Sequence, residues 1–339
     1  MLNRAVDVTV RTGFGDLPWI GADELLRLVD MNEAITVVDE AMRVLSAGSV
    51  AAPERWAMPV ADHGRMGLMP GAAPSLSRFG VKVLGLFDAD ARGALPSHQG
   101  VMLLFDLADG RPLCAVDGAA LTTLRTAAAS AVASRALARP GARTLAIIGC
   151  GDQAPLHLEA LRAVFPIREV TLWNRTAKKA DAFARRYLSG LAWRVCSTPA
   201  QAAAGADIVC TLTAATDPIL SGKDFQPGQH VNLVGSSTVG PREVDDAFVA
   251  KVRYIVDSRE HALSQAAEFV HAVGDGIVSQ DHLVGEIGDV LTGAVAGRTR
   301  PDDITAYKSL GHIIQDLAVA DAAFRKIAGP ARNGRSNAR

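Results

Sequence analysis

A glycine-rich turn near the middle of the chain has the spacing of a dinucleotide-binding motif. The apolar run 145–148 leads into Gly149-Cys-Gly-Asp-Gln-Ala154, a G-x-G-x-x-A pattern, and helix-compatible sequence follows it. A second apolar run, 169–173, completes a β-α-β unit. Glycines permit a tight turn close to a pyrophosphate, and the helix start presents unpaired N–H groups to the anion. Because the motif lies between a strand and a helix, it predicts a Rossmann-type nucleotide site.

The residues after the second apolar run indicate which dinucleotide is bound. Proteins that bind NAD usually have a carboxylate there for the ribose hydroxyl, whereas this chain has Asn174, Arg175 and Thr176. An amide, a guanidinium and a hydroxyl favour a 2′-phosphate. We therefore expect NADP(H), with NAD(H) as the alternative. Thr176 also suits the N-cap of the next helix, a role compatible with phosphate binding at the same place.

The composition indicates a cytoplasmic enzyme with room for two domains. The chain has 339 residues, 49% of them hydrophobic, which can supply a large core. Lys and Arg number 35 against 36 Asp and Glu, and aromatic residues make up 5%, so no nucleic-acid partner is expected. No membrane association is expected either, because apolar runs are short and no signal-peptide order begins the chain. The four cysteines lack metal-ligand spacing, so we expect reduced thiols and no bound metal.

The elements that must position these residues form two regions. In the first region, helices are expected over 22–26 and 31–45, and strands of an antiparallel sheet over 55–58, 65–69, 78–86, 100–106 and 112–116. In the second region, a helix over 121–138 precedes strands of one parallel sheet, expected over 145–148, 169–173, 207–211, 230–235 and 253–257. A last helix is expected over 311–328, and residues 1–17 and 330–339 are expected to be an extended lead-in and a disordered tail.

Several segments together resemble the ornithine cyclodeaminase/mu-crystallin family, over roughly 19–328. The matching pieces are Met69-Pro70, Gly80-Val-Lys82-Val, Pro96-Ser-His-Gln99, Leu124-Arg-Thr-Ala-Ala128, Ile148 to Ala154, Trp173 to Thr176, Pro227 to Asn232, Arg242 to Asp245, Tyr307 to Gly311 and Gln315-Asp316. The resemblance implies an α/β fold in which a Rossmann-type parallel-sheet nucleotide domain spans 126–309. It also implies a discontinuous α+β domain, 1–125 with 310–339, that binds the substrate and forms a homodimer.

Two positions separate the cyclodeaminases of this family from its reductases. Cyclodeaminases carry an acid just before Leu-Met-Pro and an Asp after a later Val-Gly, whereas this chain has Gly67 and Ser237. It therefore resembles the mu-crystallin, ketimine reductase side of the family. That resemblance implies an oxidoreductase that reduces the C=N bond of a small α-imino carboxylic acid with NAD(P)H, or catalyses the reverse amino-acid dehydrogenation. The alternatives are an ornithine cyclodeaminase, which is an ammonia-releasing lyase with recycled NAD, and a nucleotide-dependent binding protein without catalysis.

The resemblance also implies which residues bind the substrate. Arg55, Lys82 and Arg125 would bind its carboxylate, and Lys82 or His98 would deliver a proton. Lys82 lies in an apolar strand pattern, so it is either buried with partners or exposed on an edge strand. If it is buried, neighbouring guanidinium charges are expected to lower its pKa.

The remaining implied residues would bind the nucleotide. Thr126 would do so from the start of an alanine-rich helix, and 308–311 would close over the nicotinamide from the other domain. The complete implied set is Thr126, Gly149, Gly151, Asp152, Gln153, Ala154, Asn174, Arg175, Thr176, Thr211, Thr213, Val234, Gly235, Ser236, Ser237, Ser309, Leu310 and Gly311.

Overall fold

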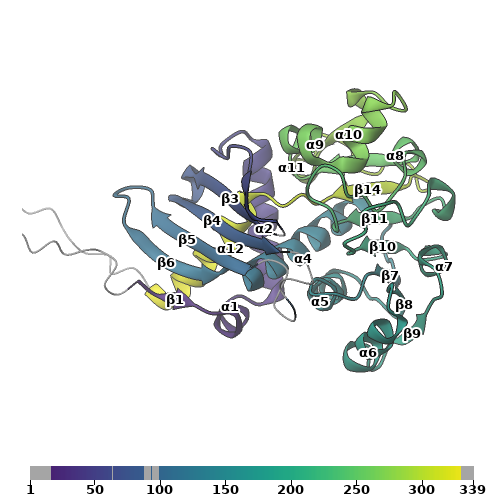
Figure 1. Cartoon of the computed structure of the whole chain (residues 1–339), viewed down its shortest axis with the longest axis horizontal. Helices are drawn as coiled ribbons and strands as arrows, with labels where there is room; N and C mark the ends of the chain where they lie inside the picture. Colours follow the sequence, from purple (N-terminus) through teal and green to yellow (C-terminus); the bar gives the residue numbers. More distant parts are fainter. Residues whose placement is uncertain (1–16, 63, 88–92, 94–98, 330–339) are drawn as a thin grey trace, which may run out of the picture.

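The computed structural model describes residues 17–62, 64–87, 93 and 99–329, which form two sheets with helices between and around them (Figure 1). The first sheet has six strands in the order β1-β6-β5-β4-β3-β2. Its strands pair antiparallel except for β1 with β6. They are β1 Trp19–Ile20, β2 Trp56–Ala61, β3 Gly64–Ala73, β4 Arg78–Phe87, β5 Gln99–Asp106 and β6 Pro112–Asp117.

The second sheet has eight strands, all parallel, in the order β13-β12-β14-β11-β10-β7-β8-β9. They are β7 Thr144–Ile148, β8 Glu169–Trp173, β9 Ala192–Val195, β10 Ile208–Thr211, β11 His230–Leu233, β12 Arg253–Val256, β13 Leu283–Glu286 and β14 Thr305–Lys308. The strand order reverses at β7, which lies between β8 and β10. Ligands of open α/β sheets bind beyond the carboxyl ends of the strands at such a reversal.

Helices cover both faces of the parallel sheet. The helices of the two regions together are α1 Ala22–Leu28, α2 Met31–Ser46, α4 Gly118–Leu137, α5 Ala154–Val164, α6 Ala177–Tyr187, α7 Pro199–Ala203, α8 Asp246–Lys251, α9 Arg259–Gln265, α10 Ala267–Gly274, α11 Ile287–Thr292 and α12 Ile313–Ala328. Along β7, Leu145 and Ile147 pack with α5 and α6, whereas Ala146 and Ile148 pack with α7 and α8. This two-sided burial explains the continuous apolar runs of these strands. The Rossmann-type α/β expectation is thereby confirmed.

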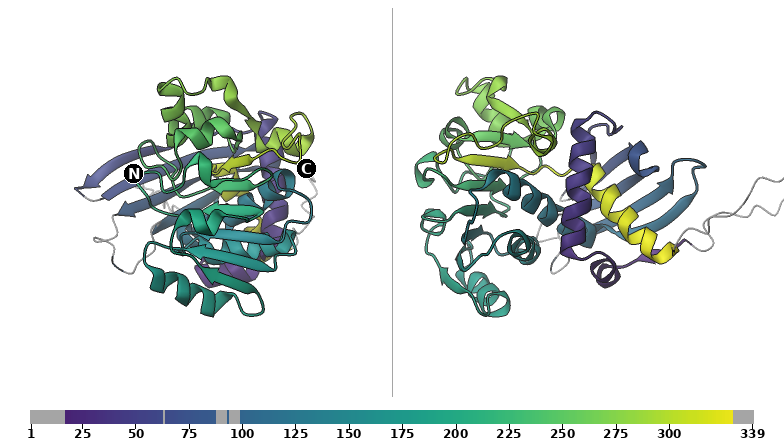
Figure 2. Two further views of the ribbon diagram at one scale, coloured as in Figure 1. Left: turned by 90° about the vertical axis from the view of Figure 1, so that its right-hand side faces the viewer. Right: turned by 180° about the vertical axis from the view of Figure 1, so that it is seen from behind.

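The six-stranded sheet is covered on one face only. Helices α4 and α12 pack on this face, and α2 packs on both helices (Figure 2). Because side chains alternate between the faces of a strand, Leu84, Met102 and Leu104 point to the helices and are buried. Val83 and Val101, on the opposite face, are only half-buried.

The structure differs from the sequence-based expectations at two places that matter for the site. Helix α4 begins at Gly118, after Asp117, whose side chain accepts a hydrogen bond from the Ala120 N–H at 2.8 Å. Thr126 therefore lies inside the helix, and the expectation that it begins a helix is wrong. The expected domain boundary between 125 and 126 also falls inside α4, which connects the two sheets.

Strand β14 is the second difference. It lies between β11 and β12, so Lys308 belongs to the parallel sheet and not to the other domain. Its short sequence, Thr-Ala-Tyr-Lys, has no strong strand pattern; the neighbouring strands on both sides provide its hydrogen-bond partners. The expected lead-in (apart from Leu17) and tail lie outside the described residues. Within the described ranges, no helix is long and apolar enough to span a membrane.

Candidate active site

The segment between β14 and α12 connects the carboxyl edge of the parallel sheet to the helices of the other sheet. The Ser309 N–H donates to the Leu233 carbonyl at 3.0 Å, and the Gly311 N–H donates to Asp257 Oδ2 at 2.6 Å. Gly311 has a φ of +82°, and a Cβ there would lie 2.5 Å from Arg125 Nη1. Only glycine fits both conditions. The segment thus brings Arg125 of α4 to the ends of β11 and β12.

Lys82 is completely buried in β4, which pairs with β3 on one side and β5 on the other. Its Nζ lies 2.8 Å from Asp316 Oδ1 and 3.3 Å from the Thr122 hydroxyl. The alternative of a solvent-facing lysine on an edge strand is therefore wrong. Asp316, in the first turn of α12, supplies the opposite charge that a buried ammonium requires.

Arg55 and Arg125 meet the same region from two other elements. Arg125 Nε lies 3.3 Å from Asp316 Oδ1, and its Nη1 donates to Gln315 Oε1 at 3.0 Å. Arg55, just before β2, donates from Nη2 to the carbonyls of Leu310 (2.8 Å) and Gly311 (3.0 Å). The structure therefore brings the three expected cations together around the start of α12.

Burial determines the electrostatics of this charged cluster. It is the largest cause that lowers the pKa of Lys82, to about 8; Asp316 opposes the shift, while Arg125 and Arg55 add to it. The expected direction was correct, but the guanidinium groups are not the main cause. Burial also raises the pKa of Asp257, against the Gly311 N–H and the Arg55 charge.

Three polar atoms of this cluster, Arg55 Nε, Arg125 Nε and Asp316 Oδ2, are buried and have no hydrogen-bond partner among the described residues. Buried polar groups in folded proteins are almost always paired. The unpaired guanidinium donors beside three cations therefore point to a small polar ligand that carries a negative charge.

The glycine-rich turn has the shape that a pyrophosphate requires. Gly149 has a φ of +104°, and a Cβ there would lie 2.7 Å from the Leu212 carbonyl oxygen. At Gly151 an added Cβ would meet no atom within 4 Å, so the space before α5 is open. Asp152 and Gln153 continue the turn, and α5 begins at Ala154. This open helix start fits an anionic dinucleotide.

The residues expected at the ribose lie just after β8. Asn174 Oδ1 accepts from the Cys150 N–H, and its Nδ2 donates to the Thr176 carbonyl, both at 3.0 Å. Asn174 thus joins this loop to the glycine-rich turn. Thr176 occupies the N-cap position of α6, but its side chain makes no capping bond, contrary to expectation. Arg175 is exposed.

A buried carboxylate joins the carboxyl ends of β10 and β11. Glu243 accepts from the hydroxyls of Thr211 (2.6 Å) and Thr213 (2.7 Å). It also accepts from the N–H groups of Thr213 (2.7 Å) and Gly235 (2.9 Å). Burial raises the pKa of Glu243, while the hydrogen bonds from Thr211 and Thr213 and the charge of Lys308 lower it. Glu243 therefore shapes the loops in which Thr211, Thr213 and Val234 to Ser237 were expected to meet the nucleotide.

Other expected residues have protein partners in this structure. The Thr126 hydroxyl donates to the Thr122 carbonyl at 2.6 Å, and the Ser236 hydroxyl donates to the Thr238 carbonyl at 3.2 Å. Ser309 and Leu310 are buried in the segment that precedes α12. Lys308 is ion-paired with buried Glu268 at 2.9 Å. His98, the second expected proton donor, lies outside the described residues.

The sequence alone suggested no role for Asp316, Asp257 or Glu243. Each nevertheless lies in a segment that resembles the family or in an expected strand. Asp316 follows the apolar pair Ile313 and Ile314 on a buried helix face, which is an unusual place for an acid. Asp257 ends an expected strand of the parallel sheet. An acidic residue within an apolar sequence pattern was thus the signal that could have identified Asp316 and Asp257. The residues that pair with them lie far away in the sequence and could not be recognised from it.

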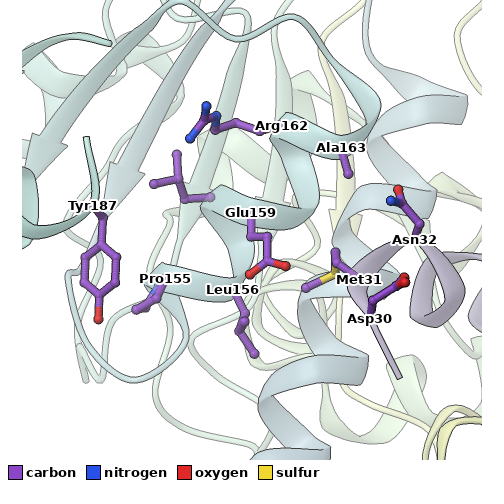
Figure 3. A pocket seen from close by; sticks show the side chains of 10 residues that line it. Asp30, Met31, Asn32, Pro155, Leu156, Glu159, Arg162, Ala163 and Tyr187 are labelled. Atoms are coloured by element: carbon purple, nitrogen blue, oxygen red, sulfur yellow. The ribbon is translucent and has the colours of Figure 1, made fainter. Parts of the chain in front are cut away.

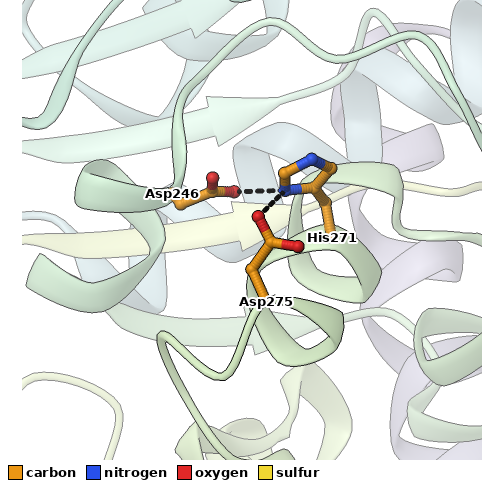
Figure 4. Close-up of side chains that lie close together, drawn as sticks. All are labelled: Asp246, His271 and Asp275. Carbon is orange, nitrogen blue, oxygen red and sulfur yellow. Dashed lines mark hydrogen bonds and ion pairs between the residues drawn. The ribbon is translucent and has the colours of Figure 1, made fainter.

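Two further features lie apart from these residues. A pocket of about 690 Å³ extends along α5 against the start of α2, and none of the expected site residues lines it (Figure 3). His271 Nδ1 lies 3.0 Å from Asp246 Oδ1 and 3.6 Å from Asp275 Oδ2 (Figure 4). Because Arg242 also binds Asp246 Oδ1 at 2.9 Å, this cluster is a partly exposed ion-pair network that joins α8 to the end of α10.

The chain matches a known protein family over most of its length. The profile of the Ornithine cyclodeaminase/mu-crystallin family matches residues 22–329. The Mus musculus ketimine reductase mu-crystallin is 38% identical over 278 residues, which are 82% of this chain and 85% of that protein.

Two solved structures show the same fold over nearly the whole chain. Thermococcus litoralis Δ(1)-pyrroline-2-carboxylate reductase in complex with NADH and L-proline has a TM-score of 0.89 and 30% identity, over 92% of this chain and 98% of that one. An archaeal alanine dehydrogenase dimer with bound NAD has a TM-score of 0.86 and 29% identity, over 92% and 96%.

Proposed function

The chain belongs to the ornithine cyclodeaminase/mu-crystallin family, and we propose that it is an NAD(P)H-dependent reductase of small α-imino carboxylic acids. The meeting of Arg55, Lys82 and Arg125 around Asp316, beside the carboxyl edge of a Rossmann sheet, carries this proposal. Dehydrogenation of the corresponding amino acid is the reverse reaction at the same site. The relatives named for ketimine and pyrroline-2-carboxylate reduction support the choice.

Each part of the charged cluster has a role in this reaction. The guanidinium groups of Arg55 and Arg125 bind the carboxylate of the substrate. This contact places the imine nitrogen beside Lys82, whose pKa near 8 suits a proton donor at neutral pH. Orientation and charge placement are the contribution of the protein. The reduced nicotinamide, when bound, supplies a hydride to the imine carbon.

Gly149, Gly151 and the start of α5 would hold the pyrophosphate of this cofactor, and Asn174 to Thr176 would hold its adenosine ribose. We propose a preference for NADP(H). Support comes from the exposed Arg175 guanidinium and from the Thr176 hydroxyl, which is not used for capping. The solved relatives contain NADH and NAD. The proposed preference therefore concerns only the 2′-phosphate that distinguishes NADP(H) from NAD(H).

A cyclodeaminase that acts on ornithine is the competing function within the family. Such an enzyme needs carboxylates for the distal amine, and this chain has Gly67 and Ser237 at the two relevant positions. Gly67 is buried in β3, where an added Cβ would lie 3.6 Å from Leu86 Cδ1. Its surroundings are therefore apolar, and they favour a neutral ring or side chain on the substrate.

A panel of cyclic and acyclic imino acids, assayed for NADPH consumption and for the amino acid product, tests the proposed function. We expect turnover with at least one imine, and no comparable release of ammonia from ornithine with NAD. Robust conversion of ornithine to proline would assign the chain to the cyclodeaminases. NADPH binding without turnover of any imine would instead indicate a nucleotide-binding protein without catalytic activity.

We also propose that the protein is a homodimer; the archaeal alanine dehydrogenase of similar fold is a dimer. The uncovered face of the six-stranded sheet carries the apolar pairs Val81 with Leu103, Val83 with Val101, and the stacked rings of Phe79 and Phe105. Edge strand β2 adds exposed Trp56 (52%), Met58 (36%) and Val60 (48%). An apolar surface of this kind marks an interface.

A further inference from the structure

We propose that Asp316 is a positioning residue of the reduction, which holds Lys82 and Arg125 in one geometry and keeps Lys82 in its proton-carrying form. The inference rests on the proposed function, because it assigns the source of the proton for imine reduction. Asp316 would not touch the reacting atoms. It would act through the lysine.

The geometry places one carboxylate oxygen between two cations. Asp316 Oδ1 lies 2.8 Å from Lys82 Nζ and 3.3 Å from Arg125 Nε, and the Lys82 and Asp316 side chains are both fully buried. The two cations come from different elements, β4 and α4, while Asp316 comes from α12. A single residue from the C-terminal part of the chain therefore sets the distance between the proton donor and a carboxylate-binding guanidinium.

The charges around Lys82 show why it needs this partner. Asp316 faces Lys82 from α12, Arg125 and the Thr122 hydroxyl face it from α4, and Arg55 adds a third, more distant positive charge. Burial and both guanidinium groups favour the neutral amine of Lys82, whereas the charge of Asp316 favours its ammonium form. With Asp316 present the pKa of Lys82 stays near 8. Without its charge, the neutral amine would dominate at neutral pH.

The reduction requires that ammonium. As the imine carbon gains a hydride, the electron pair of the C=N π bond moves to nitrogen, and the nitrogen forms an N–H bond with the proton of Lys82. The N–H bond of the ammonium breaks, Lys82 becomes neutral, and it regains a proton from solvent before the next turnover. An enzyme that begins the cycle with neutral Lys82 lacks this proton.

The test compares Asp316→Asn with wild type in a pH profile of kcat/KM for the best imine of the panel, at saturating NADPH. Asparagine keeps the shape and the oxygen that accepts from Lys82, but it removes the charge. We expect the fall of kcat/KM at high pH, near pH 8 in wild type, to move down by about one unit or more, because kcat/KM reports the free enzyme. Asp316→Glu, which keeps the charge, should retain the wild-type position even if its kcat is lower.

Asp321→Asn is the matched control. Asp321 is also buried on α12, and its Oδ1 pairs with Arg78 Nε at 2.7 Å, outside the charged cluster. Its loss should cost stability without moving the pH profile. An Asp316→Asn profile that keeps the wild-type position would overturn the proposal. A wild-type kcat/KM that stays flat from about pH 8 to about pH 10 would overturn it without any variant.

A binding measurement gives a second readout that does not need turnover. Calorimetric titration of pyrrole-2-carboxylate, in two buffers with different ionisation enthalpies, counts the protons taken up on binding. We expect uptake to be greatest near pH 8 in wild type and at lower pH in Asp316→Asn. Uptake at the same pH in both proteins would contradict the role of Asp316. If wild type neither binds this probe nor reduces any imine, the proposed function itself fails, which is a separate result.

Discussion

At the scale of one residue, burial lowers the pKa of the Lys82 side chain into the range that suits a proton donor. A free lysine remains protonated far above neutral pH, whereas the buried Lys82 has a pKa near 8, chiefly through desolvation. A proton donor works best when its pKa lies near the working pH. The same burial makes the lysine dependent on Asp316, because an unpaired buried charge is costly.

We expect Lys82→Ala to lower kcat, because a proton donor acts as the transition state forms. Lys82→Arg should not restore kcat, since a guanidinium keeps its proton at any working pH. In wild type kcat/KM should fall as pH rises through about 8, because the ammonium is the active form of the free enzyme. Steady-state kinetics over pH would show both effects. A near-normal kcat in Lys82→Ala would transfer the role of proton donor to His98.

Arg125→Ala should raise KM for the imine while NADPH binding persists. Loss of one partner from a buried charged set costs roughly 3–5 kcal/mol, which corresponds to a hundredfold or more. Arg135→Ala is the control, because Arg135 lies on the same helix and pairs with Asp39 at 2.7 Å, outside the site. If both variants had the same KM as wild type, Arg125 would not bind the substrate.

Arg175→Ala should weaken NADPH binding by roughly tenfold to hundredfold, the equivalent of about 1.5–3 kcal/mol for a charge-assisted contact. NADH binding should change little, since NADH has no 2′-phosphate. Calorimetric titration of both cofactors measures the effect. Arg185→Ala, which removes an exposed arginine in the last turn of the following helix α6, should bind both like wild type. Equal affinities for the two cofactors in wild type would rule out the proposed preference.

At the scale of elements, the segment from Ser309 to His312 decides whether the site exists. Its main-chain atoms bond to Leu233, Asp257 and Arg55, which belong to three different parts of the fold. The same segment then starts α12 and so places Gln315 and Asp316 beside Arg125. A small shift in this connection would therefore disturb both the carboxylate-binding cations and the partner of Lys82.

Gly311→Ala tests this connection. The substitution combines a positive φ with a Cβ 2.5 Å from Arg125 Nη1, so we expect lower stability and a higher KM. Gly293→Ala is the matched control, because Gly293 has a φ of +80° but open space around its Cβ. Both variants should lose about 1 kcal/mol or more in urea unfolding through backbone strain. A KM that rises equally in both would show that Gly311 has no special relation to Arg125.

At the scale of the whole molecule, one sheet is covered by helices on both faces and the other on one face only. The parallel sheet needs no further partner. The six-stranded sheet leaves a row of apolar cross-strand pairs half-buried, together with the exposed apolar side chains of β2. A second copy of the chain would bury this surface and leave the helix-covered face, with Lys82, unchanged.

Val83→Arg should therefore convert the proposed dimer to monomer, because the new charge would lie in the middle of the apolar face beside Val101. Light scattering coupled to size-exclusion chromatography gives the mass directly. Trp193→Arg, at an exposed apolar position (42%) on edge strand β9 of the other sheet, is the control and should remain a dimer. A monomeric wild type would refute the proposed assembly.

Local patterns were sufficient for five of the eight strands of the parallel sheet, β7, β8, β10, β11 and β12. The turn at Gly149, the continuous apolar strands and the alternation with helices each depend on neighbours within a few residues, so they could be recognised without the tertiary structure. The antiparallel strands of the other sheet were also expected in nearly the right places. Strand β14 was not, because its hydrogen-bond partners are β11 and β12, which local sequence does not reveal.

The sequence by itself determined the family, the glycine-rich turn and the presence of three cations that suit a carboxylate. Only the tertiary structure showed that Lys82 faces Asp316, 234 residues later in the chain, and that Glu243 holds the ends of β10 and β11. The physical reason is that a pKa and an ion pair depend on burial and on distances in space. Burial and these distances are fixed when separate elements pack together. Neither produces a repeating pattern in the sequence.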